Sequence, residues 1–157
     1  MKTSISKTIN YIDPQTHMRV ISHFSSQQTH ILDREHQELW SINTFIGQKI
    51  IFLSNDGQRL VLFGHHNGGS RLKVPSSSLH VEDPIMEIYH AGNIENQLTF
   101  VQVFQCTMQE MIVQYNVQQL GGGWISMHHF MSIDYIDWNH QCLYFLYKDG
   151  TQGKVDF

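Results

Sequence analysis

Two methionines and a histidine recur at two-residue spacing in residues 127–131. Residues two apart share one face of a strand, so a strand here would align Met127, His129 and Met131. Thioether and imidazole groups suit a soft metal ion such as Cu(I). Steps of about 6.6 Å along one strand are too long for three side chains to reach one ion, so a second strand would have to contribute. A core or interface face is the favoured interpretation, since Met fills cores readily, and a soft-metal site is the alternative.

A second candidate is the pair His65-His66, which is followed by Asn67 and then by Gly68-Gly69. Two imidazoles fall short of the three or four ligands of a usual metal site, and no HxH or HExxH spacing accompanies them. A surface loop whose charge changes near neutral pH is the favoured interpretation. Exposed loop residues suit contact with a partner, so we expect His65, His66 and Asn67 to be partner-binding residues.

Aromatic residues gather in the C-terminal third of the chain and form a third candidate group. Exposed Trp and Tyr stack on ligands and supply much of the binding energy of protein interfaces, whereas buried ones belong to the core. We expect Trp138 and Tyr147, in the last strong hairpin, to join the histidine loop in binding a partner.

Motifs for catalysis are missing from the sequence. Asp134 and Asp137 lie three apart, hence on opposite faces of a strand, and do not form the carboxylate pair of a glycosidase. There is no GxSxG motif, and the glycine triplet at residues 121–123 lacks the Lys-Ser/Thr of a phosphate-binding loop. A non-enzymatic function is favoured and no cofactor is expected, while a catalytic site assembled from distant strands stays open.

The composition limits the class of partner and the compartment. The chain has 157 residues, 10 Lys and Arg and a formal charge of −4, which argues against binding nucleic acid through its phosphates. No apolar run approaches the roughly 20 residues that span a bilayer, so no membrane partner is expected. Cys106 and Cys142 are too few for a disulfide framework, which predicts two reduced thiols in a cytoplasmic protein.

Residues 51–63 indicate the fold class. Two apolar runs flank Asn55-Asp56-Gly57, and an Asp-Gly between β-prone runs is a strong hairpin signal because Gly takes the positive φ of the turn. Residues 91–97 are predicted as a polar turn. Other short apolar runs predict further strands over residues 17–24, 30–32, 39–42, 71–74, 79–81, 85–89, 98–104, 111–117, 124–130, 133–138, 142–147 and 154–157.

Short strands without a βαβ unit predict an all-β fold of antiparallel hairpins or meander sheets, arranged as a sandwich, a barrel or a small propeller-like array. One domain over residues 1–157 is expected, with residues 1–15 as a mobile leader or an edge strand. The favoured function is a non-catalytic protein-interaction module that masks a partner protein, as inhibitors and immunity proteins do, or that self-associates. The alternative is a small-ligand binder that holds a carbohydrate or a soft metal ion on an aromatic or Met/His face.

Overall fold

The Asp-Gly turn and its two strands are present as predicted in a computed structural model that describes residues 7–66, 69, 71–73, 82–118 and 124–157. Gly57 has a φ of +71°, the left-handed conformation that this turn requires. The Ser54 hydroxyl donates to the Asp56 carboxylate at 2.6 Å, and the Gly57 amide donates to the Ser54 carbonyl at 2.9 Å. The surrounding structure is all-β and consists of antiparallel sheets.

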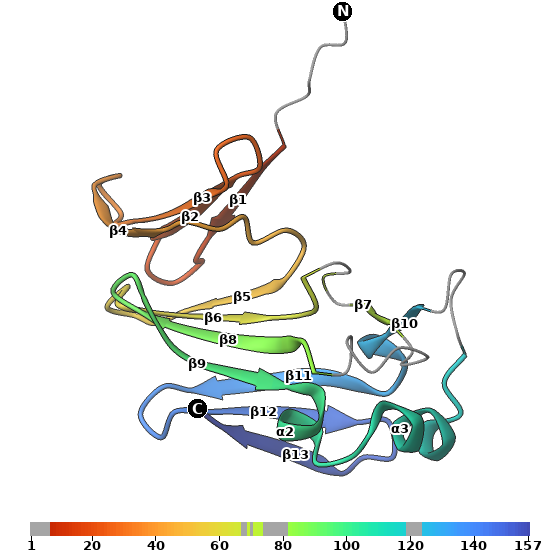
Figure 1. The fold of residues 1–157 in the computed structure, drawn as a ribbon. Helices are drawn as coiled ribbons and strands as arrows, with labels where there is room; N and C mark the ends of the chain where they lie inside the picture. The colour runs from red at the N-terminus through yellow and green to blue at the C-terminus, as the bar shows by residue number, and fades with distance from the viewer. Residues whose placement is uncertain (1–6, 67–68, 70, 74–81, 119–123) are drawn as a thin grey trace, which may run out of the picture.

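Two four-stranded antiparallel sheets follow each other along the chain (Figure 1). The first consists, in spatial order, of β1 (Thr8–Ile12), β2 (Arg19–His23), β3 (Gln28–Leu32) and β4 (Glu38–Ile42). The second consists of β5 (Ile50–Leu53), β6 (Arg59–Phe63), β8 (Pro84–His90) and β9 (Asn93–Thr99). β1 lies at the edge of the first sheet.

The C-terminal residues form a third sheet, and a small fourth sheet lies beside the stack. The third sheet consists of β11 (Met131–Asp137), β12 (Cys142–Tyr147) and β13 (Gln152–Asp156), with β13 at its edge. The fourth pairs β7 (Arg71–Lys73) with β10 (Trp124–Ser126). The predicted last hairpin and its closing edge strand are thus confirmed.

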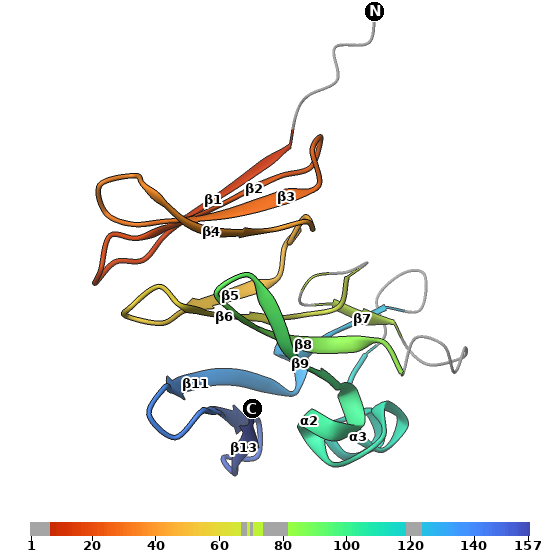
Figure 2. The same ribbon diagram turned by 60° about the vertical axis from the view of Figure 1, so that its left-hand side comes forward.

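The three larger sheets lie on one another as layers, with the helices α2 (Phe100–Phe104) and α3 (Met108–Tyr115) beside the third sheet (Figures 1 and 2). Alternation along β6 explains how the middle sheet packs on both sides. Leu60 and Leu62 join the core shared with the first sheet, whereas Val61 and Phe63 join the core shared with the helices and the third sheet. The described residues form no closed barrel, and successive meanders stacked in this way resemble the packing of propeller blades.

The strands predicted over residues 98–104 and 111–117 are wrong beyond Thr99, because the first segment contains all of α2 and the second contains most of α3. A capping box starts each helix. The Thr99 hydroxyl accepts from the Gln102 amide while the Gln102 side chain accepts from the Thr99 amide, and Thr107 and Glu110 repeat the arrangement. A threonine followed three residues later by Gln or Glu is a helix-start signal, and here it outweighs the β-propensity of the apolar residues that follow.

Two other segments differ from the prediction. Asn93–Thr99, most of which was predicted as a polar turn, forms β9, because its backbone pairs with β8 while its polar side chains stay exposed. The strand predicted over residues 124–130 ends at Ser126, and Met127–His129 form the 3₁₀ turn η2. The strand predicted over residues 79–81 lies outside the described residues.

Candidate functional site

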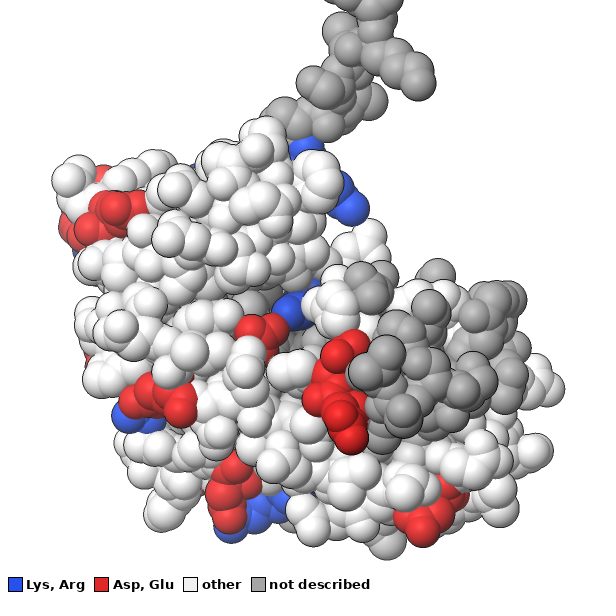
Figure 3. Space-filling view, viewed as in Figure 1, with Lys and Arg blue, Asp and Glu red and all other residues white. Residues whose placement is uncertain are grey.

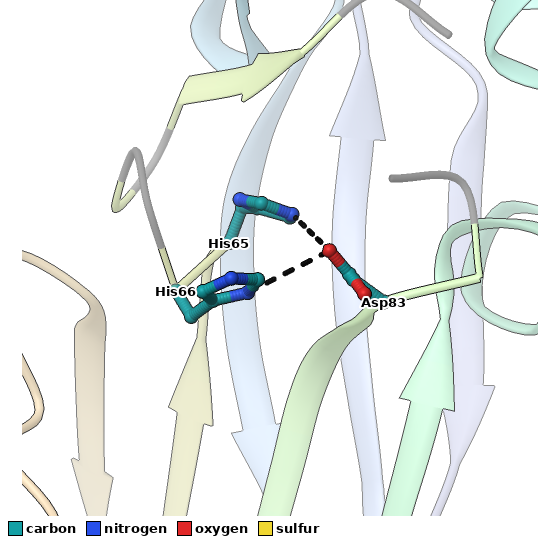
Figure 4. Close-up of side chains that lie close together, drawn as sticks. All are labelled: His65, His66 and Asp83. Atoms are coloured by element: carbon teal, nitrogen blue, oxygen red, sulfur yellow. Dashed lines mark hydrogen bonds and ion pairs between the residues drawn. The ribbon is translucent and has the colours of Figure 1, made fainter. Parts of the chain in front are cut away.

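Three side chains that could ligate a metal ion, His65, His66 and Asp83, lie together at one end of the second sheet (Figure 4). His65 Nε2 is 3.0 Å from Asp83 Oδ2, and His66 Nδ1 is 3.8 Å from the same oxygen. One donor atom from each side chain lies within 4.8 Å of the other two. No other group of three such ligands occurs in the part of the chain that the structure describes.

Backbone hydrogen bonds hold the two segments that carry these side chains. The Gly64 amide donates to the Ile85 carbonyl at 2.7 Å, which keeps the end of β6 beside the start of β8. His65 and Gly69 exchange two backbone hydrogen bonds of 2.6 and 2.8 Å. A Cβ on Gly64 would lie 2.3 Å from the Gly69 carbonyl oxygen, and the φ of Gly64 is +141°. The loop can close in this way only because residue 64 is glycine.

The three side chains differ in their access to water. The His65 side chain is 1% exposed and lies edge-on to Trp124, with 6.2 Å between ring centroids. The His66 side chain is 51% exposed and that of Asp83 is 30% exposed. The two imidazole rings are 4.3 Å apart. A solute therefore reaches the group from the side of His66.

The exposure predicted for this loop is found at His66 but not at His65. The expectation that His65 is exposed is wrong, because its ring is buried and pairs with Asp83. Asn67 lies outside the described residues. Sequence reasoning missed Asp83, since Asp83-Pro84 is an ordinary turn signal. Only the antiparallel pairing of β6 with β8 brings it next to His65, 18 positions away.

Trp138 lies where turns from the three larger sheets meet. These turns follow β1, β5 and β11 and project from the same side of the stack (left in Figure 2). Trp138 lines two neighbouring hollows of about 350 and about 320 Å³. We call this region the Trp138 surface, defined by lining residues in or beside the turns: Tyr11, Asp13, Gln15, Asn55, Asp56, Arg59, Trp138, Asn139 and Gln141.

Polar groups surround the half-buried Trp138 ring, which packs edge-on against Phe157 at 6.0 Å between centroids. Hydrogen bonds from the Ser54 hydroxyl and the Gln58 amide lower the pKa of Asp56, so this carboxylate is charged at neutral pH. The amide side chains of Asn55, Asn139 and Gln141 line the same hollow as Asp56, and that of Gln15 lines the neighbouring one. The region therefore offers a flat apolar ring, negative charge and both hydrogen-bond donors and acceptors.

Tyr147, the other aromatic residue predicted to bind a partner, lies at the far end of β12 from Trp138. Its half-buried ring stacks on Tyr115 at 5.6 Å, and burial raises the pKa of Tyr147 to about 12. Five steps along β12 separate the two ends by about 17 Å. The structure therefore does not bring Trp138 and Tyr147 together, and His65 likewise follows the end of β6 that is remote from the Trp138 surface.

The candidate soft-metal residues do not form the expected row on a strand. Met127 and His129 belong to the η2 turn, and Met131 begins β11. Both methionines are buried in the core shared with the helices, which agrees with the favoured core interpretation. His129 is half-buried, and its buried Nδ1 has no hydrogen-bond partner among the described residues. A soft-metal site here stays a prediction without the strand geometry that suggested it.

The charges on the surface are scattered over the face drawn in Figure 3. Lys and Arg occur there singly or beside Asp and Glu, and the described residues of this face form no continuous basic surface. None of the described helices has the length and apolar character needed to cross a bilayer. Cys106 and Cys142 are both free thiols.

Comparisons with known proteins do not assign the chain to a family. No protein-family model matches the sequence, and no curated protein matches it. A solved chain described as the crystal structure of the eukaryotic initiation factor aligns with 99% of this chain at 10% identity and a TM-score of 0.43. The present chain covers 34% of that chain. A likeness at this level establishes neither a shared fold nor a shared function.

Proposed function

We propose that this chain is a non-catalytic protein-interaction module whose Trp138 surface covers a site on a partner protein, in the manner of inhibitors and immunity proteins. The observation that carries the proposal is the meeting of turns from three separate sheets around one tryptophan. Tryptophan is among the residues that dominate interface binding energy. Two hollows that share this ring form a wide surface, which suits another chain better than a small molecule.

The chemistry of the Trp138 surface supports a polar protein segment as the partner. Asp13 and Asp56 supply negative charge, while Arg59 is directed to Glu95, with 3.6 Å between their charged groups. Protein interfaces combine an aromatic centre with a polar rim in the same way. The partner segment that fits best carries a basic side chain next to an apolar one.

The proposal includes a cytoplasmic location and a partner that is neither nucleic acid nor membrane. Two free cysteines support a reducing compartment. The formal charge of −4 and the scattered Lys and Arg of Figure 3 support a partner other than a phosphate backbone.

The test compares the proteins that wild type, Trp138→Ala and Tyr135→Ala retain from a lysate of the source cells, measured by quantitative mass spectrometry. Tyr135 is the matched control, an exposed aromatic residue on the outer face of the third sheet. Loss of a central tryptophan costs about 2 kcal/mol or more, roughly 30-fold in affinity. We therefore expect one partner that wild type and Tyr135→Ala retain and Trp138→Ala loses.

Two results contradict the proposal: equal retention of every partner by the three proteins, or retention of none. Native mass spectrometry of the same proteins separates a distinct partner from self-association. A dimer mass that disappears in Trp138→Ala would identify a second copy of this chain as the partner.

A carbohydrate is the second candidate ligand. The observation that favours it is the position of the Trp138 ring beside the amides of Asn139 and Gln141 in a hollow of about 350 Å³. A flat ring with neighbouring planar polar groups can stack on a sugar and bind its hydroxyls. Saturable glycan binding by wild type and Tyr135→Ala, but not by Trp138→Ala, would favour this function over the protein partner.

A further inference from the structure

His65, His66 and Asp83 present donor atoms that transition metals prefer, at separations close to those of a metal site. In a tetrahedral zinc site with bonds of about 2.0–2.1 Å, neighbouring ligand atoms lie about 3.3–3.4 Å apart. Asp83 Oδ2 lies 3.0 Å from His65 Nε2 and 3.8 Å from His66 Nδ1, on either side of that value. Shifts of a few tenths of an ångström bring these contacts to the separation that the ion requires.

We propose that His65, His66 and Asp83 bind Zn²⁺ through two imidazole nitrogens and one carboxylate oxygen, with a further position open to solvent. Nitrogen ligands favour Zn²⁺ and its neighbours in the transition series over Mg²⁺ and Ca²⁺, which take oxygen ligands. Three protein ligands and an open fourth position distinguish an accessible zinc site from a closed structural one. The open side is that of His66, whose side chain is 51% exposed.

Two of the three ligands are already held in place. His65 is fixed by its two backbone hydrogen bonds to Gly69 and by burial of its ring. Asp83 directly precedes β8, whose first residues are tied to the end of β6 by the bond from Gly64 to Ile85. Ligands that are ordered before the ion arrives lose little conformational entropy on binding.

The position of His66 distinguishes a metal site from a purely structural ion pair. The pair of the buried His65 ring and Asp83 would by itself fasten β6 to β8, and that role needs no second imidazole. Yet the exposed His66 ring lies with Nδ1 toward the same Asp83 oxygen (Figure 4). Replacing His66 removes one ligand and leaves the contact between His65 and Asp83 intact, so this substitution tests metal binding without removing the structural contact.

Binding of the ion replaces the contact between His65 Nε2 and Asp83 Oδ2, which lie 3.0 Å apart. A neutral imidazole carries one proton, so His65 binds the metal through the Nε2 lone pair with that proton on Nδ1. Imidazole binds metal only in its unprotonated form, so the affinity for Zn²⁺ falls with decreasing pH. The site lies at the opposite end of the second sheet from the Trp138 surface, so it does not depend on the proposed protein partner.

The test is a titration of the full chain, purified without a histidine tag and treated with a chelator. Zn²⁺ binding is measured by calorimetry and Co²⁺ binding by visible absorption, at about pH 7.5 and about pH 5.5. His66→Ala removes one ligand, and Asp83→Asn replaces the charged carboxylate ligand with a neutral amide. The matched control is His140→Ala, which breaks an exposed His–Asp pair of 2.8 Å that is not part of a three-ligand group.

We expect wild type and His140→Ala to bind one ion per chain, with affinity that falls at the lower pH. His66→Ala and Asp83→Asn should bind at least about tenfold more weakly, because the first lacks a ligand and the second lacks the negative charge of the carboxylate ligand. Circular dichroism confirms that the variants are folded, and the exposed position of His66 makes His66→Ala the deciding variant. The proposal is overturned if wild type shows no saturable binding or if His66→Ala binds as tightly as wild type. Loss of binding in His129→Ala but not in His66→Ala also overturns it, since the ion would then lie at the predicted soft-metal residues.

Discussion

Lys49 and Glu87 form a nearly buried ion pair, and Lys49→Met is expected to destabilise the fold strongly. Lys49 Nζ lies 2.5 Å from Glu87 Oε1, and the two side chains are 9% and 15% exposed. Glu87 also accepts a hydrogen bond of 2.8 Å from the Tyr89 hydroxyl. Lys49 directly precedes β5 and Glu87 lies in β8, on the other side of β6, so the pair fastens the second sheet across three strands.

The expected loss of stability is about 3 kcal/mol. Removing one partner of a buried ion pair costs about 3–5 kcal/mol, because the other charge is left without compensation. The lower value applies here because Tyr89 still donates to the Glu87 carboxylate in the variant. Lys49→Met combined with Glu87→Met removes both charges and should recover most of the loss. Lys154→Met is the control and should cost less than about 1 kcal/mol, since its pair with Asp156 is 49% and 76% exposed.

The pH dependence of this loss has a definite sign. Burial raises the pKa of Glu87, but the charge and hydrogen bond of Lys49, together with hydrogen bonds from Tyr89 and Gln97, more than offset burial, so the pKa lies below its ordinary value. Such a carboxylate adds stability above its unfolded pKa of about 4.3, and this stability is lost as the pH falls through the folded pKa. Without Lys49, burial dominates and the pKa of Glu87 rises, so protonation relieves the unpaired charge. The loss caused by Lys49→Met should therefore be largest near about pH 7 and shrink toward about pH 4.

Urea unfolding, followed by tryptophan fluorescence at about pH 7 and about pH 4.5, measures the free energy of unfolding of each protein. The reasoning is refuted if Lys49→Met costs no more than Lys154→Met at the higher pH. It is also refuted if the loss is the same at both pH values, because an uncompensated carboxylate must respond to protonation.

Three further predictions use the same unfolding assay. Gly153→Ala should cost about 1–3 kcal/mol, since a Cβ there would lie 2.4 Å from the Phe145 ring, and an unchanged midpoint would contradict this packing. Thr107→Ala should cost about 1 kcal/mol, because it removes the hydroxyl that accepts from the Glu110 amide, while Thr107→Ser, which keeps a hydroxyl, should cost less. The pKa of Tyr147 is raised to about 12, chiefly by burial, so its contribution to stability is lost as pH rises from about 10 through 12. Tyr147→Phe should weaken that pH dependence, and a dependence equal to that of wild type would count against it.

Sequence reasoning succeeded where short-range turn chemistry decides the structure. The hairpin around Asp56-Gly57 and the hairpin of β11 and β12 were predicted because neighbouring strands joined by a tight turn must pair with each other. It failed for α2, where an apolar run fits a strand and a helix equally well. The missed signal was the capping box of Thr99 and Gln102, which is local and was available in the sequence.

By itself the sequence determined the all-β class and the main hairpins, and it singled out His66 and Trp138 as candidate partner-binding residues. Only the tertiary structure decided that Asp83 lies beside His66 and that three turns meet at Trp138. It also decided that Tyr147 lies far from the Trp138 ring and from these turns. The reason is that hairpin pairing depends on residues a few positions apart, whereas these contacts depend on strand order and on the stacking of sheets. The sheets stack because both faces of β6 are buried. Apolar residues from distant parts of the chain are needed to cover these two faces.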